Sequence, residues 1–160
     1  MSRPTHTILM LALLSCWGAV GSAADSETET IIIRADRAWE EEDDREVLHF
    51  KGDFELIAPD WQLNADEADL FGPMDDPDRI LARGAPAVVL IVSDEETIRG
   101  EGDEIEYLRE ADVLTLRGNA ELKGEKLFMK SNEIVYDVGT ERLKSSGDQG
   151  VEMILERDAR

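Results

Sequence analysis

The side chains that could carry out chemistry in this sequence are few. It contains two histidines, His6 and His49, and one cysteine, Cys16. His49 lies within an alternating apolar segment, so we interpret it as an exposed or hydrogen-bonded strand residue and not as a catalytic base. His6 and Cys16 belong to an apolar N-terminal segment, which leaves too few ligands for the usual zinc triad, and no nucleophile elbow is present. The sequence therefore predicts no catalytic residue, no metal site and no cofactor.

Acidic side chains are abundant, with 37 Asp and Glu against 17 Lys and Arg and a formal net charge of −20. The runs 40–44 and 75–78 lack the ligand spacing, glycine and closing glutamate of an EF-hand, so we interpret both as solvated turns. A glycosidase needs two carboxylates that face each other across a cleft, and nothing in the sequence selects a pair. Nucleic acid and anionic membrane surfaces are poor partners, because both require basic patches.

The first 24 residues have the pattern of a cleavable secretory signal. Arg3 precedes an apolar run over residues 8–20, and small residues at 21–24 follow it. The run is short for a bilayer span, which needs about 20 residues. The segment 13–16 loosely fits a lipoprotein cleavage site, so lipidation of Cys16 stays open. Residues 25–160 are expected to form a single exported domain that is stabilised by packing, without disulfides.

A repeat of about thirty residues organises this domain. The segment "GDFELIAPDWQLNADEADLF" from Gly52 aligns without a gap with "GNAELKGEKLFMKSNEIVYD" from Gly118. Two more units end at Gly84 and Gly147. A second marker, centred on Asp or Asn, recurs at 34–38, 64–68, 101–105 and 130–134.

Each unit is predicted to be β, because its apolar residues alternate with polar ones as in half-buried strands. The alternation changes phase at Asp66 and Asn132, so a bulge or sharp corner must absorb one residue there. We therefore expect an all-β fold, in which a long antiparallel meander bends into a V-shaped trough with apolar walls and a charged outside. Irregular loops are expected at 72–78 and 92–103, with a turn at 100–102.

The first and last apolar segments, "ETIIIRAD" and "VEMILERD", have no further strand of the chain to cover their outer sides. Open strand edges accept another strand, so we expect head-to-tail self-association through these segments. Such a contact is heterologous and should give chains of growing length. The edge residues predicted for this contact are Ile31, Ile32, Ile33, Val151, Met153 and Leu155.

The exported segment resembles the LptA/OstA family of periplasmic lipopolysaccharide-export proteins. The resemblance lies in "IIIRADRAWEEEDDREVLHFKGDFELIAPDWQLNADEADLF", "RGAPAVVL", "GEGDEIEYLREADVLTLRGNAEL" and "GDQGVEMIL", which together span nearly all of it. It implies a twisted β-jellyroll without enzyme activity that binds the lipid A acyl chains of lipopolysaccharide. It also implies end-to-end stacking between LptC-like inner-membrane and LptD-like outer-membrane jellyroll domains. An LptC-type component is the alternative, although a cleavable signal and an end at Arg160 favour the bridge.

The resemblance places lipid contacts on the inward side of the jellyroll, at Ile31, Ile33, Val89 and Tyr107. The alternation adds Leu48, Phe50, Leu63, Leu114, Leu116, Met129, Ile134 and Tyr136. Ordinary core packing explains each position equally well, so a closed β-repeat scaffold or adaptor is the second hypothesis. The acidity of the chain suggests that acyl burial, with the headgroup left outside, would dominate binding.

Overall fold

The computed structural model describes residues 30–41, 44–93, 96–146 and 150–156, and the predicted signal at 1–24 lies outside them. The described residues form ten β-strands without a helix, which confirms the predicted all-β fold. Every pair of neighbouring strands is antiparallel. The strands are β1 (Ile32–Arg34), β2 (Arg37–Glu41), β3 (Asp44–Ile57), β4 (Trp61–Phe71), β5 (Arg79–Val92), β6 (Thr97–Leu108), β7 (Val113–Lys123), β8 (Leu127–Asp137), β9 (Arg142–Ser146) and β10 (Glu152–Leu155).

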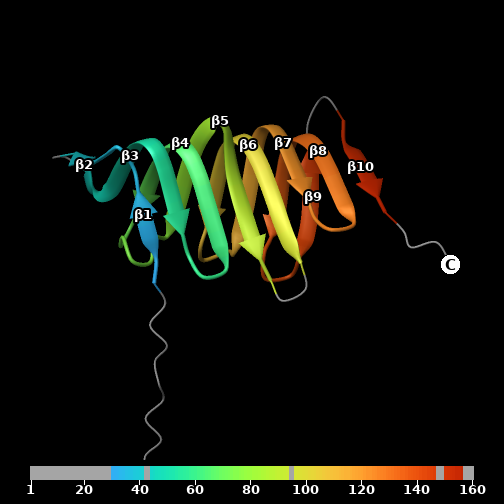
Figure 1. Ribbon diagram of the computed structural model, residues 1–160, viewed down its shortest axis with the longest axis horizontal. Helices are drawn as coiled ribbons and strands as arrows, with labels where there is room; N and C mark the ends of the chain where they lie inside the picture. Colours follow the sequence, from blue (N-terminus) through green and yellow to red (C-terminus); the bar gives the residue numbers. More distant parts are fainter. Residues whose placement is uncertain (1–29, 42–43, 94–95, 147–149, 157–160) are drawn as a thin grey trace, which may run out of the picture.

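The six long strands, β3 to β8, form a meander in which each pairs with the next along the chain (Figure 1). At one end of the sheet, β1 and β2 pair with different halves of β3. At the other end, β9 and β10 pair with different halves of β8. The two ends of the molecule are therefore each made of two short strands.

The long strands bend where the pairing register shifts. The shifts include residues 52–53 of β3, Asp66 of β4 and the stretch of β7 opposite Asn132 of β8. Gly52 and Asp53 have φ angles of 84° and 44°, and their repeat counterparts Gly118 and Asn119 have 71° and 49°. These left-handed conformations favour Gly, Asn and Asp. The corners predicted from the change of phase are confirmed.

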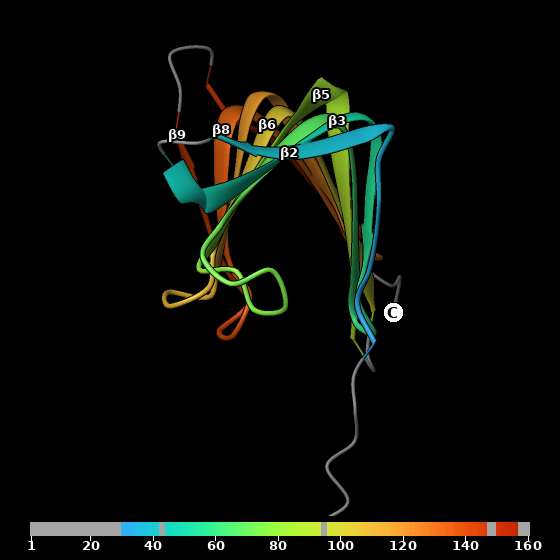
Figure 2. The ribbon, with the colours of Figure 1, turned by 90° about the vertical axis from the view of Figure 1, so that its left-hand side faces the viewer.

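The bends divide the sheet into two walls, which join along the bends and spread towards the opposite margin (Figure 2). Wall 1 contains β1, β10 and the residues 54–57, 61–64, 87–92, 97–101, 120–123 and 127–131 of the long strands. Wall 2 contains β2, β9 and the residues 44–51, 67–71, 79–83, 104–108, 113–117 and 133–137. We call the margin opposite the bends the rim.

The core lies between the walls, where apolar side chains from both inner faces pack together. Its largest fully buried members include Phe54, Leu63, Leu116 and Ile134. Because alternate residues of a strand point to opposite faces, this core leaves the polar residues of each strand outside. The apolar alternation of the sequence is thus used to fill the space between two halves of one sheet.

Two local expectations were wrong. β6 begins at Thr97, so the glycines at 100 and 102 lie within a strand and the predicted loop after Val92 is short. Glycine is depleted in strands, which misled the interpretation. At Gly100 a Cβ would lie 2.9 Å from Cγ1 of Val89 and 3.0 Å from Cδ1 of Leu116, so this glycine leaves room for side chains of both walls. The loop predicted at 72–78 is confirmed between β4 and β5.

The second concerns the acidic run 40–44, which was interpreted as a solvated turn. Its ends belong to strands, since Glu40 and Glu41 end β2 and Asp44 begins β3, whereas residues 42 and 43 lie outside the described residues. All five residues of β2 are exposed, and an edge strand with no buried face carries no apolar alternation to reveal it.

A row of alternating charges crosses the outer face of wall 2 beside the bends, and we call it the outer charge row. The row consists of Lys51, Glu67, Arg83, Glu104, Arg117 and Glu133, each of which lies opposite the next on the neighbouring strand. Arg83 Nε lies 3.2 Å from Glu104, and Arg117 Nε lies 3.2 Å from Glu133. Opposite charges on neighbouring strands favour this pairing register, in which the apolar residues of each strand face inward.

Candidate functional site

The inner faces of the two walls carry apolar rows that run from one end of the molecule to the other. The first inner row, on wall 1, consists of Ile33, Leu56, Leu63, Val89, Gly100, Leu122, Met129 and Met153. The second inner row, on wall 2, consists of Ala38, Phe50, Ala68, Ala82, Ile105, Leu116, Ile134 and Ser145. Neither row contains a charged side chain.

A third inner row lies closer to the rim of wall 2. It consists of Glu40, Leu48, Leu70, Ile80, Tyr107, Leu114, Tyr136 and Leu143. Its only charged member, Glu40, stands at the exposed end.

The structure places the predicted lipid-contact residues on these rows, with one exception. Phe50, Leu63, Val89, Leu114, Leu116, Met129, Ile134 and Tyr136 are buried core residues, and Ile33, Leu48 and Tyr107 are partly buried against them. The exception, Ile31, precedes β1 and is 41% exposed. Geometry therefore brings the set together along one interior, while their contact with lipid stays a prediction.

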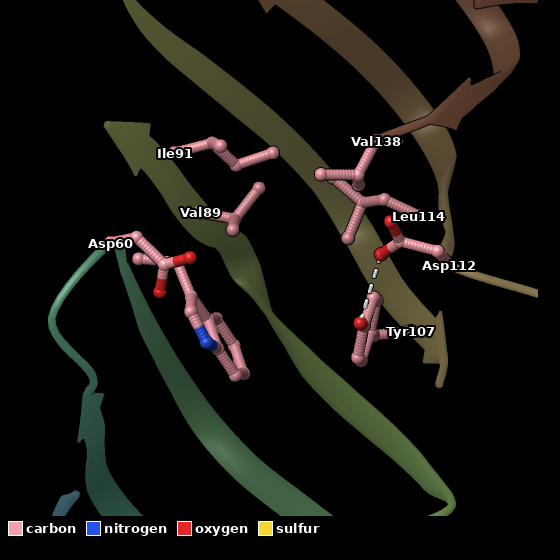
Figure 3. A pocket seen from close by; sticks show the side chains of 8 residues that line it. Asp60, Val89, Ile91, Tyr107, Asp112, Leu114 and Val138 are labelled. Atoms are coloured by element: carbon pink, nitrogen blue, oxygen red, sulfur yellow. Dashed lines mark hydrogen bonds between the residues drawn. The ribbon is translucent and has the colours of Figure 1, made fainter. Parts of the chain in front are cut away.

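The middle of this interior is filled by the protein's own side chains. Leu63 of wall 1 is 1% exposed, and Leu116 and Ile134 of wall 2 are 0% exposed. A hollow remains nearer the rim, where a cavity of about 180 Å³ lies between the walls (Figure 3). Its lining residues are Asp60, Trp61, Val89, Ile91, Tyr107, Asp112, Leu114 and Val138. We call it the rim cavity.

Two aromatic rings bridge the walls at the rim cavity. Trp61 begins β4 in wall 1, Tyr107 lies near the end of β6 in wall 2, and their ring centroids are 5.8 Å apart. The Tyr107 hydroxyl donates a hydrogen bond of 3.0 Å to Oδ1 of Asp112 (Figure 3). Asp112 lies in the turn before β7 and has a φ of 50°, a left-handed conformation that Asp tolerates.

The electrostatics of the rim cavity favour the protonated form of Tyr107. Burial raises the pKa of the Tyr107 hydroxyl, and the hydrogen bond to Asp112 and the negative charges of Asp112 and Asp60 raise it further, to about 12. Burial also raises the pKa of Tyr136 in the same inner row. Both phenols therefore keep their protons at neutral pH.

Sequence reasoning missed most of the rim cavity. Trp61 and Ile91 could have been found, since both continue the apolar alternation of their strands. Asp60 and Asp112 carried no signal, because they lie in turns and acidic residues are common throughout this chain.

The predicted edge residues lie at opposite ends of wall 1. Ile32 and Ile33 belong to β1 with Ile31 just before it, and Met153 and Leu155 belong to β10 with Val151 just before it. Each of these strands pairs on one side with a long strand and has no other neighbour among the described residues. Ile32 is 39% exposed and Leu155 is 64% exposed, so both edges present apolar side chains to solvent.

His49 lies outside the trough. Its Nδ1 is 2.7 Å from Oδ1 of Asp69, and its ring stacks on Trp39 with centroids 5.4 Å apart, all on the outer face of wall 2. Within the part of the chain that the structure describes, no three His, Cys, Asp or Glu residues gather as a metal site. The same residues contain no helix long and apolar enough to cross a membrane.

Comparisons with known proteins identify a family and a similar fold. Residues 32–142 match the family model described as "LptA/(LptD N-terminal domain) LPS transport protein". A solved structure of LptH, described as the LptA homologous periplasmic component of the lipopolysaccharide transport device from Pseudomonas aeruginosa, is similar with a TM-score of 0.71 and 18% identity. That match covers 81% of this chain and 96% of the other and confirms the jellyroll fold. A comparison with curated protein sequences found no match.

Proposed function

The chain belongs to the LptA/LptD N-terminal domain family of LPS transport proteins, and from this premise we propose that it is a bridge protein that carries lipopolysaccharide across the periplasm. In this proposal residues 1–24 are a cleavable signal and residues 25–160 are one periplasmic domain. The domain receives lipopolysaccharide from an LptC-like jellyroll at the inner membrane and delivers it to an LptD-like jellyroll at the outer membrane. It binds and shields the lipid without catalysing a reaction.

The observation that carries the proposal is the continuity of the first and second inner rows. From Ile33 to Met153 and from Ala38 to Ser145, every strand contributes an uncharged residue to the path between the two ends. A charged side chain on this path would be costly to desolvate beside an acyl chain. The rows therefore form an apolar track on which acyl chains could move lengthwise with their headgroup outside.

Carriage requires the walls to separate, because the interior is already packed. The rim cavity of about 180 Å³ is smaller than the 300–1,000 Å³ typical of pockets for drug-sized ligands. When acyl chains enter between the walls, Leu63 would lose contacts with its neighbours and gain similar contacts with lipid. Its apolar surface would therefore stay away from water. The bends would act as the hinge, since residues there already depart from regular strand geometry.

The packed middle also supports a second candidate function. A closed β-repeat scaffold or adaptor would keep Leu116 and Ile134 permanently buried, as they are here, and would use its acidic loops to bind a partner. The two candidates differ in whether the inner rows ever contact lipid.

Photo-crosslinking tests this difference with neighbouring residues that face opposite sides. Photoreactive side chains are placed at Ile33 and Met129 of the first inner row, and matched controls at Ile32 and Phe128 of the adjacent outer row. The bridge proposal expects crosslinks to lipopolysaccharide from positions 33 and 129 and much weaker ones from 32 and 128. Equal labelling of all four positions, or none in a folded protein, would favour the scaffold.

The direction of the end strands supports the proposed stacking of copies. β1 runs from the rim to the bend and β10 from the bend to the rim, so β1 of a second copy would extend wall 1 beside β10 as an antiparallel strand. The same holds in wall 2 for β2 beside β9. Both walls can therefore continue from one copy into the next.

The residue rows give a register for this stack. If each row continued across the junction, Ile32 would face Ile154 and Ile33 would face Met153 of the neighbouring copy. Arg34 would face Glu152 in the row that also contains Glu55, Glu121 and Lys130. Apolar side chains would meet on both faces of the junction, and the charges beside it would alternate in sign, as cross-strand pairs prefer.

A further inference from the structure

The rim cavity combines features that a pure acyl-chain site does not need. Val89, Ile91 and Leu114 supply apolar walls, yet the carboxylates of Asp60 and Asp112 lie among the lining residues. Both carboxylates act on the Tyr107 hydroxyl, so their negative potentials overlap at this point. An anionic headgroup would be repelled here, whereas a cation would be attracted.

Aromatic rings complete the arrangement. Trp61 and Tyr107 both line the cavity, with an angle of 41° between their planes. Trp and Tyr rings attract cations through their π faces, and cages of such rings recognise quaternary ammonium groups. Two aromatic rings, two carboxylates and an apolar wall together suit a ligand that joins a positive charge to a hydrocarbon chain.

The positive charge of Arg109 opposes burial and the two carboxylates in their effect on the pKa of Tyr107, and it is the smallest of these influences. Arg109 follows β6 at the rim, and its guanidinium is bound to Asp76 at 2.9 Å and to Asp78 in the loop after β4. The side chain of Asp60, in contrast, forms no hydrogen bond or ion pair with any other residue that the structure describes. Its charge is therefore available to a ligand.

We propose that the rim cavity is a binding site for single-chain alkylammonium amphiphiles. The ammonium group would lie against Trp61 and Tyr107 between the carboxylates of Asp60 and Asp112, and the first part of the chain would enter towards Val89. The small volume, about 180 Å³, suits one chain and not several. This site does not depend on the proposed transport of lipopolysaccharide, because the cavity exists while the walls are in contact.

The test compares three amphiphiles that share a twelve-carbon chain and differ in the headgroup. Dodecyltrimethylammonium, dodecyl maltoside and dodecyl sulfate are titrated below their micellar concentrations, and binding is followed by NMR shifts of the Val89 and Leu114 methyl groups and by calorimetry. We expect the cation to bind about tenfold more tightly than the neutral maltoside, which corresponds to one cation–π contact with a desolvated ion. Equal affinities of the three headgroups would overturn the proposal.

Matched variants separate the cavity from the overall charge of the protein. In the double variant Asp60→Asn with Asp112→Asn, the affinity for the cation should fall to within about twofold of the affinity for the maltoside, because the local negative charge is removed. The control is Asp53→Asn with Asp66→Asn, which removes the same charge from a hollow on the outer side of the bends. If the control weakens cation binding as much as the cavity variant does, the attraction is a property of the whole acidic surface and the proposed site is wrong.

Trp61→Leu tests the aromatic part while it keeps the wall apolar. We expect the cation to lose about tenfold in affinity while the maltoside changes little. A circular dichroism spectrum equal to that of the wild type would show that the variant is folded. Unchanged cation binding by the folded variant would overturn the proposed cage.

Discussion

Gly118 shows at the scale of one residue why the repeat keeps glycine at its corners. Its φ is 71°, and a Cβ there would lie 2.9 Å from the Cβ of Asp103 on β6. We expect Gly118→Ala to lower the free energy of unfolding by about 2–3 kcal/mol, from backbone strain and overpacking together. Gly150→Ala is the control, because Gly150 has a φ of 80° with nothing within 4 Å of an added Cβ. Its cost should be only about 1–2 kcal/mol. Equal losses in urea unfolding would show that the contact with Asp103 is unimportant.

Tyr107 offers a spectroscopic prediction at the rim cavity. Its pKa of about 12 arises first from burial and then from the hydrogen bond and charge of Asp112. In an absorbance titration, Asp112→Asn should lower the pKa of Tyr107, but not to its ordinary value, since burial remains. Asp60→Asn should lower it less, because Asp60 acts through its charge alone. If Asp60→Asn lowered the pKa of Tyr107 more than Asp112→Asn does, the hydrogen bond between Tyr107 and Asp112 in Figure 3 would be contradicted.

The same pKa predicts how stability changes in alkali. An unfolded tyrosine loses its proton near pH 10, whereas folded Tyr107 retains it to about pH 12. The folded state therefore binds more protons in this interval, and the stability that Tyr107 contributes below pH 10 should be lost as the pH rises towards 12. Urea unfolding at successive pH values would reveal this slope, which Asp112→Asn should reduce.

The residues of the inner rows were predictable, whereas the acidic residues of the rim cavity were not. Leu63, Leu116 and Ile134 follow from alternation, which reports the face of a strand directly. Asp60 and Asp112 come from turns in different repeat units, and only the folding of the sheet brings them to one cavity. Periodicity along a single sequence does not indicate which turns lie close together in the folded protein.

At the scale of elements, Arg117 is the centre of the outer charge row. It donates to Glu104 at 3.2 Å, Glu106 at 2.8 Å and Glu133 at 3.2 Å, from strands on both sides of β7. We expect Arg117→Met to lower the free energy of unfolding by about 1 kcal/mol, since partly exposed ion pairs contribute little individually. Arg99→Met is the control, because the ion pair of Arg99 is with Glu101 of its own strand. A larger loss in the control would show that the row does not hold the strands in register.

Arg117 also determines the response to acid. Burial alone would raise the pKa of Glu106, but hydrogen bonds and charges from Arg117 and Arg79 outweigh it and hold this pKa below its usual value. Stability from a carboxylate with a lowered pKa is present above the unfolded pKa and is lost as the pH falls through the folded one. Arg117→Met should therefore flatten the decline in stability below about pH 4.5, as measured by urea unfolding at low pH.

Most elements were predictable because the repeat and its change of phase encode the bent strands. The bend needs a residue that tolerates positive φ, and Gly52 with Asp53 and Gly118 with Asn119 supply it at equal positions of two units. β2 escaped detection because it buries no face, and the start of β6 because Gly100 is a packing residue and not a turn residue. The exceptions are thus strands whose side chains do not alternate in the usual way.

At the scale of the whole molecule, the two ends are apolar while the rest of the surface is strongly acidic. The exposed large apolar residues include Ile31, Ile32 and Trp39 at one end and Met153 and Leu155 at the other. The net charge of −20 opposes the approach of a second copy. Stacking should therefore depend on a balance between apolar contact at the ends and repulsion between the acidic sides.

The length of the chains in solution should reflect this balance and the proposed register of Arg34 with Glu152. Light scattering at increasing protein concentration should show chains that lengthen with salt, since at physiological ionic strength repulsion is screened beyond a Debye length of about 8 Å.

Arg34→Glu should shorten the chains at every salt concentration, because it places two acids side by side at each junction. Adding Glu152→Arg to the same chain restores opposite charges across the junction without changing the net charge of the original protein. It should restore part of the length, because each copy then places like charges beside Glu55 and Lys130. Deletion of residues 151–160 should abolish stacking altogether. A double variant as short as Arg34→Glu would refute the register, and a wild-type protein that stays monomeric at all salt concentrations would refute the stack itself.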